Sequence, residues 1–245
     1  MTAYHGGKAR GGKEIAKIIT SLVDRIEDRL FHFTGYWEPF CGMCGVYRHI
    51  PALLGDRSYL ASDIHPSLIL MWQALQEGWH PPKRVTKQMY NKLKTSPDSS
   101  PEKAYVGFGF SFAGIYFNGK FNPDLARRMP QLSSRVMSVA SDLRNVRFKQ
   151  ASYEQIQVTG WVIYCDPPYE GSSNGFKLDQ GVGTFSSDAF WIWARHMSRN
   201  NLLLVSEYDA PDDFRPIYQR KIRATCRRGH DAAKKEFIFI HESWL

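Results

Sequence analysis

The chain contains no hydrophobic run approaching the roughly 20 residues needed to cross a bilayer. Its N-terminal stretch also has no apolar segment of the kind found in a secretory signal. The 245 residues are nevertheless 43% hydrophobic and 14% aromatic, which is typical of a globular protein with a real core. These features argue against a membrane partner and predict a cytoplasmic protein.

Cysteine is scarce, and the cysteines present are not arranged as a metal site. The spacing Cys41-x-x-Cys44 is not completed by a second pair, since the other cysteines are Cys165 and Cys226. Reduced thiols of a cytosolic protein are the favoured interpretation. The eight histidines show no metal-ligand spacing, and a Gly-x-Ser-x-Gly nucleophile elbow is absent. The sequence therefore predicts no metal and no serine hydrolase.

Acidic residues are few in one part of the chain. The net charge is +8, and residues 81–150 contain 13 lysines and arginines against four acids, an excess of nine. This stretch therefore accounts for the whole surplus. A surface that binds a polyanion is the favoured interpretation, with an ordinary solvated surface as the alternative.

The hydrophobic pattern alternates between strands and helices. Helices are expected over 13–30, 44–53, 66–76 and 187–199 and around Phe214, and strands over 36–39, 58–62, 146–150, 161–165, 202–206 and 236–241. Such alternation predicts an α/β fold with a parallel sheet and crossover helices.

The alternation stops near Gly78. The following residues are basic and include an aromatic stretch, 108–117, which would either stack on nucleotides or form a small core. We therefore expect a small, mostly helical insertion domain over 78–145, between two parts of one catalytic domain, 1–77 and 146–245.

The most specific local signal is Asp166-Pro167-Pro168-Tyr169, directly after the apolar strand 161–165. Methylation of an exocyclic aryl amine needs an acceptor for its N–H groups, because the nitrogen lone pair is delocalised into the ring. A carboxylate and a proline carbonyl are suitable acceptors, since proline has no competing N–H. The aromatic ring could stack on a base flipped out of a duplex. A structural Pro-rich turn with a capping Asp is the alternative.

A second signal combines the turn Glu38-Pro-Phe40-Cys-Gly42 with Asp63. A glycine turn after a strand lets a nucleotide-like cofactor approach the backbone. An acid at the end of the next strand is placed to bind ribose hydroxyls. Each feature alone is usually structural, and their combination with Asp166-Pro-Pro-Tyr169 strengthens the prediction of a cofactor site.

Five motifs, taken in their order along the chain, resemble those of Dam-type DNA adenine-N6 methyltransferases, and the resemblance covers nearly the full length. They are Tyr4-His-Gly-Gly-Lys8, Glu38-Pro-Phe-Cys-Gly42, Asp63-Ile-His-Pro-Ser-Leu-Ile, Phe117-Asn-Gly-Lys-Phe-Asn122 and Asp166-Pro-Pro-Tyr169. The resemblance implies a Rossmann-like S-adenosylmethionine-dependent catalytic domain with a target-recognition insertion. It also implies double-stranded DNA as the partner, and a bacterial cell or a phage-infected host as the location.

The resemblance assigns roles to individual residues. Tyr4, Lys8, Asp63 and Asp166 would contact S-adenosylmethionine, and Glu38, Phe40 and Gly42 would form the floor and turn of its pocket. Asp166, Pro167 and Tyr169 would hold the adenine. Within the insertion, we expect Lys120, Asn122, Arg127 and Arg128 to contact DNA.

Three departures from the family pattern are visible. Cys44 takes the position of the second glycine in Phe-x-Gly-x-Gly, the stretch 117–122 is abbreviated, and the loop 171–184 lacks clear family residues before Thr184. Residues 230–237 resemble the family's final hairpin, although Lys234 and Lys235 could equally be solvent-facing charges. An RNA or other amine methyltransferase, or a catalytically weak DNA-binding homologue, is the alternative.

Overall fold

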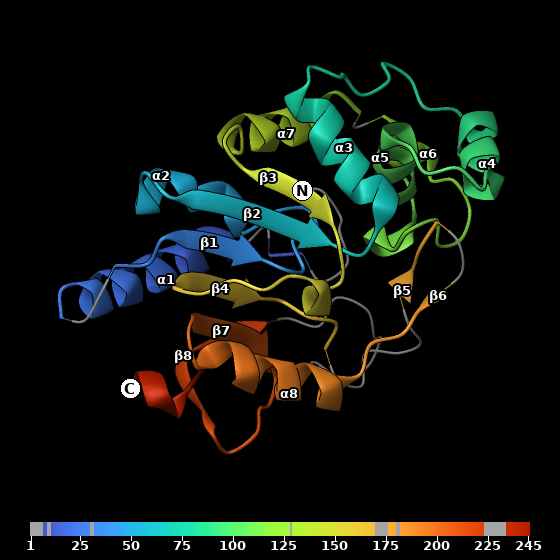
Figure 1. Cartoon of the computed structure of the whole chain (residues 1–245). Coiled ribbons are helices and arrows are strands. Elements are labelled where there is room, and N and C mark those ends of the chain that lie inside the picture. The colour runs from blue at the N-terminus through green and yellow to red at the C-terminus, as the bar shows by residue number, and fades with distance from the viewer. Residues whose placement is uncertain are drawn as a thin grey trace.

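In the computed structural model, helices cover both faces of a seven-stranded sheet (Figure 1). The structure describes residues 7–8, 11–29, 32–127, 129–169, 176–179, 182–222 and 234–245. In spatial order the strands are β3 (Arg147–Gln150), β2 (Ser58–Asp63), β1 (Gly35–Glu38), β4 (Trp161–Cys165), β7 (Leu202–Glu207), β9 (Lys234–His241) and β8 (Phe214–Ile222). This arrangement is compatible with a Rossmann-like methyltransferase fold.

The helices and the remaining strands connect these elements. The α-helices are α1 (Gly12–Glu27), α2 (Pro51–Leu54), α3 (Pro66–Gln76), α4 (Lys87–Thr95), α5 (Pro101–Gly109), α6 (Pro123–Ala126), α7 (Met129–Asp142) and α8 (Ser187–Ser198). Short 3-10 turns are η1 (Tyr47–His49), η2 (Phe112–Gly114), η3 (Tyr153–Gln155) and η4 (Glu242–Trp244). A separate ribbon pairs β5 (Phe176–Lys177) with β6 (Val182–Gly183). No helix in the described part of the chain is both long and apolar enough to span a membrane.

The strand order reverses at the centre of the sheet. Strand β1 pairs in parallel with β2 on one side and with β4 on the other, while β9 runs antiparallel between β7 and β8. In open α/β sheets, ligands bind outside the carboxyl ends of the strands at such a reversal. The carboxyl ends of β1 and β4 are therefore the expected position of a site.

Side chains on the two faces of the sheet belong to two separate hydrophobic clusters. Along β4, Val162 and Tyr164 face the cluster that contains α1 and α3, whereas Ile163 and Cys165 face the cluster that contains α8. Successive side chains of a strand point to opposite faces, so a fully buried strand is apolar throughout. This explains why 161–165 could be identified as a strand without an alternating pattern.

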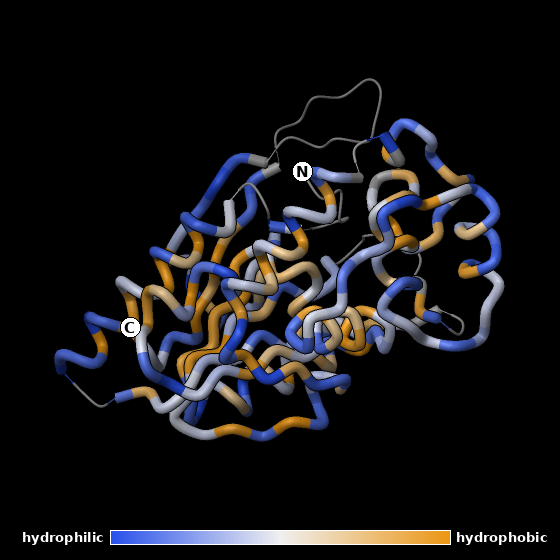
Figure 2. The backbone as a smooth tube through the Cα atoms, turned by 90° about the horizontal axis from the view of Figure 1, so that it is seen from above, coloured by the Kyte–Doolittle hydropathy of each residue, from blue (hydrophilic) through white to orange (hydrophobic). Residues whose placement is uncertain are grey.

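Between α3 and β3, in residues 78–145, all the regular elements that the structure describes are helices. Its buried aromatic residues, including Tyr90, Tyr105 and Phe110, belong to the same cluster as α1 and the sheet. Figure 1 shows α4 to α7 gathered beside α3 at one edge of the sheet. In Figure 2, hydrophobic and hydrophilic residues alternate along the backbone of these helices. These helices share one hydrophobic core with the sheet. The division into a catalytic domain and an insertion domain therefore stays a prediction.

The aromatic stretch 108–117 mainly forms core. Phe108, Phe110, Tyr116 and Phe117 are buried, whereas Phe112 is 65% exposed. Most rings of this stretch therefore form core, which was one of its two interpretations, and do not lie free on the surface to stack on nucleotides.

Several predicted elements match the structure closely, and two do not. Helix α3 and strand β4 have the predicted bounds. The expected helix around Phe214 is wrong, because this residue begins β8, which is paired antiparallel with β9. The expected helix over 44–53 is replaced by η1 and α2.

Candidate functional site

The predicted site residues of the catalytic half converge at the strand reversal. Glu38 ends β1, Asp63 ends β2 and Asp166 follows β4. Because these strands are parallel neighbours, their carboxyl ends lie at the same edge of the sheet. Tyr4 lies outside the described residues.

The turn after β1 has an unusual backbone that is held from two sides. Gly42 has a φ of 47°, and Cys44 has a φ of 54°. The Gly42 N–H donates to Asp63 Oδ2 at 3.0 Å, and the Trp72 indole N–H donates to the Gly42 carbonyl at 3.0 Å. Left-handed backbone favours glycine, so the structure explains why a glycine is expected at position 44 and places the buried Cys44 in a strained conformation.

The start of α1 approaches the same turn. A Cβ atom on Gly12 would lie 1.9 Å from the backbone oxygen of Gly45. Glycine at position 12 is therefore required for α1 to begin directly against this turn.

Asp63 is a partly buried carboxylate with fixed orientation. Its Oδ1 accepts from the His65 N–H at 3.0 Å, and its Oδ2 accepts from Gly42. Burial raises the pKa of Asp63 to about 6, against the lowering effect of these backbone hydrogen bonds. A carboxylate has about four lone-pair sites, so two backbone donors leave acceptor capacity for the hydroxyls of a ribose.

The ammonium group of Lys8 is the centre of a buried charge network. It lies 2.6 Å from the Tyr169 hydroxyl and 3.0 Å from Glu236 Oε1, and it forms a short ion pair with Asp166. The Tyr169 hydroxyl donates to Glu236, whose other oxygen accepts from Arg220. Two cations and two carboxylates thus balance one another at the end of β4.

The protonation of the two carboxylates follows from their surroundings. Burial raises the pKa of Asp166, and Lys8 counteracts this rise. Burial also acts to raise the pKa of Glu236, but Lys8 and Arg220 lower it below its usual value. Glu236 therefore stays ionised and holds Lys8 and Tyr169 in place.

Glu236 and Arg220 were missed by sequence reasoning. They lie on β9 and β8, which are far from the Asp166 motif in the chain. One signal for Glu236 is present: it shares a strand face with the buried residues Ile238 and Ile240. A charged residue on a buried face needs a partner. Lys235, on the other face, is exposed.

Glu38 and Phe40 lie at and just after the end of β1, at the expected base of the site. Glu38 is buried and accepts a hydrogen bond from the Tyr36 hydroxyl at 2.7 Å, and burial raises its pKa well above the usual range. Phe40 is half-buried and contacts the rings of Tyr153, Phe185 and Phe190, with centroids 5.4 to 6.0 Å away. These neighbours fix the ring at the expected floor of the pocket.

The donor set fits the chemistry of S-adenosylmethionine. Asp63 offers acceptors for ribose hydroxyls, the turn at Gly42 brings backbone close, and Lys8 and Asp166 offer one charge of each sign for an amino-acid group. Pro167, which follows Asp166, is buried. In the described part of the chain, no group of three His, Cys, Asp or Glu side chains is arranged to hold a metal. Cys41, Cys44 and Cys165 are buried free thiols.

Of the predicted DNA-contacting residues, Lys120, Asn122 and Arg127 lie on the helical segment between α3 and β3. Lys120 and Arg127 are exposed, and the Arg127 side chain forms a 3.5 Å ion pair with Asp124. The Asn122 side chain accepts from the Asp124 N–H and caps α6. Arg128 lies outside the described residues. Four cations contribute to the lining of a hollow of about 490 Å³ beside Arg127, which is lined by Lys83, Arg84, Val85, Thr86, Lys87, Phe121, Arg127 and Pro130.

Comparison with known proteins gives a distant relationship. No family model matches the chain. The chain is similar to proteins named DNA adenine methylase from two strains of Vibrio cholerae serotype O1, one classical Ogawa and one El Tor Inaba. Each is 25% identical over 193 residues, which cover 65% of this chain and 68% of the relative. The similarity supports a Dam-like methyltransferase.

Proposed function

We propose that the chain is an S-adenosylmethionine-dependent DNA methyltransferase that modifies N6 of an adenine flipped out of duplex DNA. The observation that carries the proposal is the position of Asp166, paired with Lys8 where the strand order reverses. The similarity to proteins named DNA adenine methylase supports adenine as the base.

The residues around Asp166 are suited to an aryl amine. The Asp166 carboxylate and the Pro167 carbonyl would accept the two N6 hydrogens, and this would favour pyramidal nitrogen with an available lone pair. Bound S-adenosylmethionine would supply a methyl group on a positively charged sulfur. Asp166 would stabilise the charge that develops on N6 and hold the proton that the amine loses.

The surrounding network keeps these acceptors in place. Lys8 and Glu236 hold the Tyr169 hydroxyl, and the Tyr169 ring also contacts Tyr208 with centroids 4.6 Å apart. A ring fixed at its hydroxyl end can stack on a flipped base without losing further side-chain freedom. Catalysis would therefore come mainly from positioning and from charge stabilisation.

The test is to incubate purified protein with S-adenosylmethionine and either duplex DNA or RNA, followed by nucleoside mass spectrometry. We expect N6-methyladenine in the DNA sample. N4-methylcytosine as the main DNA product would overturn the choice of base, because both are exocyclic aryl amines that the same acceptors would serve. Methylation confined to RNA would favour the RNA methyltransferase alternative.

A catalytically weak DNA-binding homologue is the second candidate, and one observation favours it. Cys44 adopts left-handed backbone at a position where the family has glycine, in the turn that would approach the cofactor. Calorimetric titration with S-adenosylmethionine separates the candidates. Binding together with transfer supports the enzyme, whereas DNA binding without either supports the weak homologue.

A further inference from the structure

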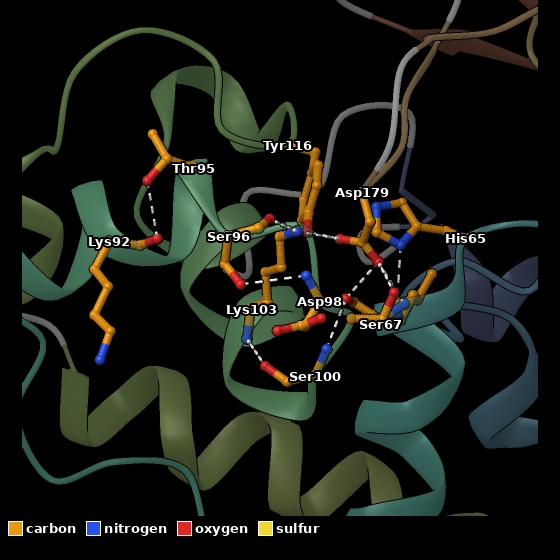
Figure 3. Close-up of polar contacts among 12 residues, drawn as sticks. His65, Ser67, Lys92, Thr95, Ser96, Asp98, Ser100, Lys103, Tyr116 and Asp179 are labelled. Atoms are coloured by element: carbon orange, nitrogen blue, oxygen red, sulfur yellow. Dashed lines mark hydrogen bonds and ion pairs between the residues drawn. The ribbon is translucent and has the colours of Figure 1, made fainter.

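A second buried polar cluster surrounds Asp179 (Figure 3). Its Oδ2 accepts from the Ser67 N–H at 3.1 Å, the Ser67 hydroxyl at 2.5 Å and the Ser99 hydroxyl at 2.7 Å. Its other oxygen accepts from the Tyr116 hydroxyl and lies 3.3 Å from Lys103 Nζ. The carboxylate is thus satisfied by donors from four places in the chain.

The cluster contains a buried ion pair. The side chains of Lys103 and Asp179 are each 1% exposed, and Lys103 Nζ also donates to the Ser96 carbonyl at 2.7 Å. Burial acts to raise the pKa of Asp179, but hydrogen bonds from Ser67, Tyr116 and Ser99 lower it below its usual value. Buried charges are tolerated when they are paired and hydrogen-bonded, and such a network strongly favours one arrangement of its members.

The arrangement connects the parts of the molecule that the proposed reaction uses. Asp179 belongs to the connection between β4, which the Asp166 motif follows, and α8. Lys103 lies on α5, in the helical segment that carries the exposed cations. Ser67 lies in the first turn of α3, two residues after His65, whose N–H donates to Asp63. Figure 3 shows these side chains converging on the Asp179 carboxylate.

We propose that Asp179 is a positioning residue, an inference that rests on the proposed function. Its carboxylate holds the described residues 176–179, which follow the Asp166 motif in the chain, against α3 and α5, and so positions the end of β4 relative to the helical segment that would bind DNA. Asp179 takes no part in the chemical step.

The experiment compares the unaltered chain with Asp179→Asn, which keeps the shape of the side chain and removes its charge. Ser99→Ala is a milder second variant, because it removes one donor and leaves the ion pair with Lys103. Asp98→Asn is the matched control, since Asp98 is an exposed acid of the same region.

Two measurements are made on each variant. Hydrogen exchange at the Ser67 amide reports the anchoring, because this N–H lies in the first turn of α3 and donates to Asp179. The single-turnover rate of methyl transfer to DNA is measured per cofactor-binding site, counted by calorimetry, so that unfolded protein does not enter the rate.

We expect Asp179→Asn to accelerate exchange at Ser67 and to slow transfer by about 10- to 100-fold, the scale of a small misplacement of reacting groups. Affinity for S-adenosylmethionine should change less than about twofold, since Asp63 keeps its hydrogen bonds from Gly42 and His65. Ser99→Ala should show both effects more weakly, and Asp98→Asn neither. Faster exchange at Ser67 with an unchanged transfer rate would overturn the positioning role. An unaltered chain that transfers no methyl group to DNA would overturn the proposed function, and with it this role.

Discussion

Charged groups at the proposed catalytic edge, the carboxyl ends of β1, β2 and β4, and the cations Lys120 and Arg127 of the helical segment have opposite environments. At the edge, Lys8 and Glu236 are 6% and 3% exposed and lie within a network of ion pairs. On the helical segment, the Arg127 side chain is 84% exposed, and Lys120 is also exposed. Charges act strongly at fixed positions where water is excluded, whereas a polyanion can be attracted by hydrated cations without fixed geometry. The proposed function assigns chemistry to the first region and DNA attraction to the second, and this difference supports that assignment.

Removal of the catalytic carboxylate should give the largest effect. We expect Asp166→Ala to lower the rate of methyl transfer by about 10² to 10³ or more, the scale for loss of a group that stabilises developing charge. The fold should persist, because Lys8 keeps Glu236 as an ion-pair partner. The measurement is transfer of labelled methyl groups to DNA, with circular dichroism to check folding.

The control for this variant is Asp56→Ala, which removes an exposed acid before β2. It should transfer methyl groups at the normal rate. A near-normal rate for Asp166→Ala would refute the assignment of chemistry to this edge.

The second largest effect is expected at Asp63. Asp63→Ala leaves the N–H groups of Gly42 and His65 without their acceptor and removes the expected ribose contact. Affinity for S-adenosylmethionine should weaken by about 1–3 kcal/mol, the scale for an unpaired buried polar group. Calorimetry measures this directly, and unchanged affinity would remove Asp63 from the cofactor site.

The elements that could be predicted from the sequence are those specified by local signals. Helix α3 has Pro66 in its first turn and His65 as a capping residue, and β4 is a short apolar run that is followed by an acid. By contrast, β8 depends on pairing with β9 across residues distant in the chain, so Phe214 gave no local sign of a strand. The expected helix over 44–53 is interrupted because the backbone of Cys44 is left-handed and Pro51 begins a new turn of helix.

The same distinction applies to the candidate site. Asp166, Glu38 and Asp63 stand at strand ends, and parallel pairing alone brings them to one edge. Glu236 lies in the stretch that resembles the family's final hairpin, which gave it no role, and Asp179 lies in a loop without clear family residues; their contacts appear only when distant segments meet. Sequence patterns therefore found the residues next to the strands, and missed those that hold the residues in place.

Neutralisation of the predicted DNA-contacting cations should affect DNA binding and leave cofactor binding unchanged. We expect replacement of Lys120, Arg127 and Arg128 by Gln to lower the slope of log affinity against log salt by about one for each lost phosphate contact. The matched control replaces Lys13, Lys17 and Arg25 on α1, which are also exposed. Fluorescence anisotropy over a salt series measures both. An equal loss of slope in the control would mean that the helical segment contributes only general surface charge.

The smallest expected effect is a pH dependence confined to the catalytic edge. Since burial raises the pKa of Asp63 to about 6, its carboxylate becomes protonated as the pH falls through 6, and an acceptor for ribose hydroxyls is lost. Affinity for S-adenosylmethionine should therefore fall several-fold between pH 8 and pH 5.5. His65 stays neutral over this range, because burial lowers its pKa to about 4. Acid unfolding caused by Asp63 does not explain this loss of affinity. The pKa of Asp63 is higher in the folded chain than the unfolded value of 3.8, so its protonation favours folding at acid pH. This contribution to stability is lost as the pH rises from about 4 to about 6.

Asp63→Asn provides the control for this last comparison, because its amide does not titrate. Calorimetry at each pH should give a weaker but nearly constant affinity for the variant, whereas the unaltered chain should lose affinity as the pH falls. Lysine and arginine side chains in general remain charged throughout this interval, so DNA binding through the helical segment should not weaken with it. An equally steep loss of cofactor affinity in Asp63→Asn would assign the titration to another group of the catalytic edge, such as Asp166, whose pKa burial also raises.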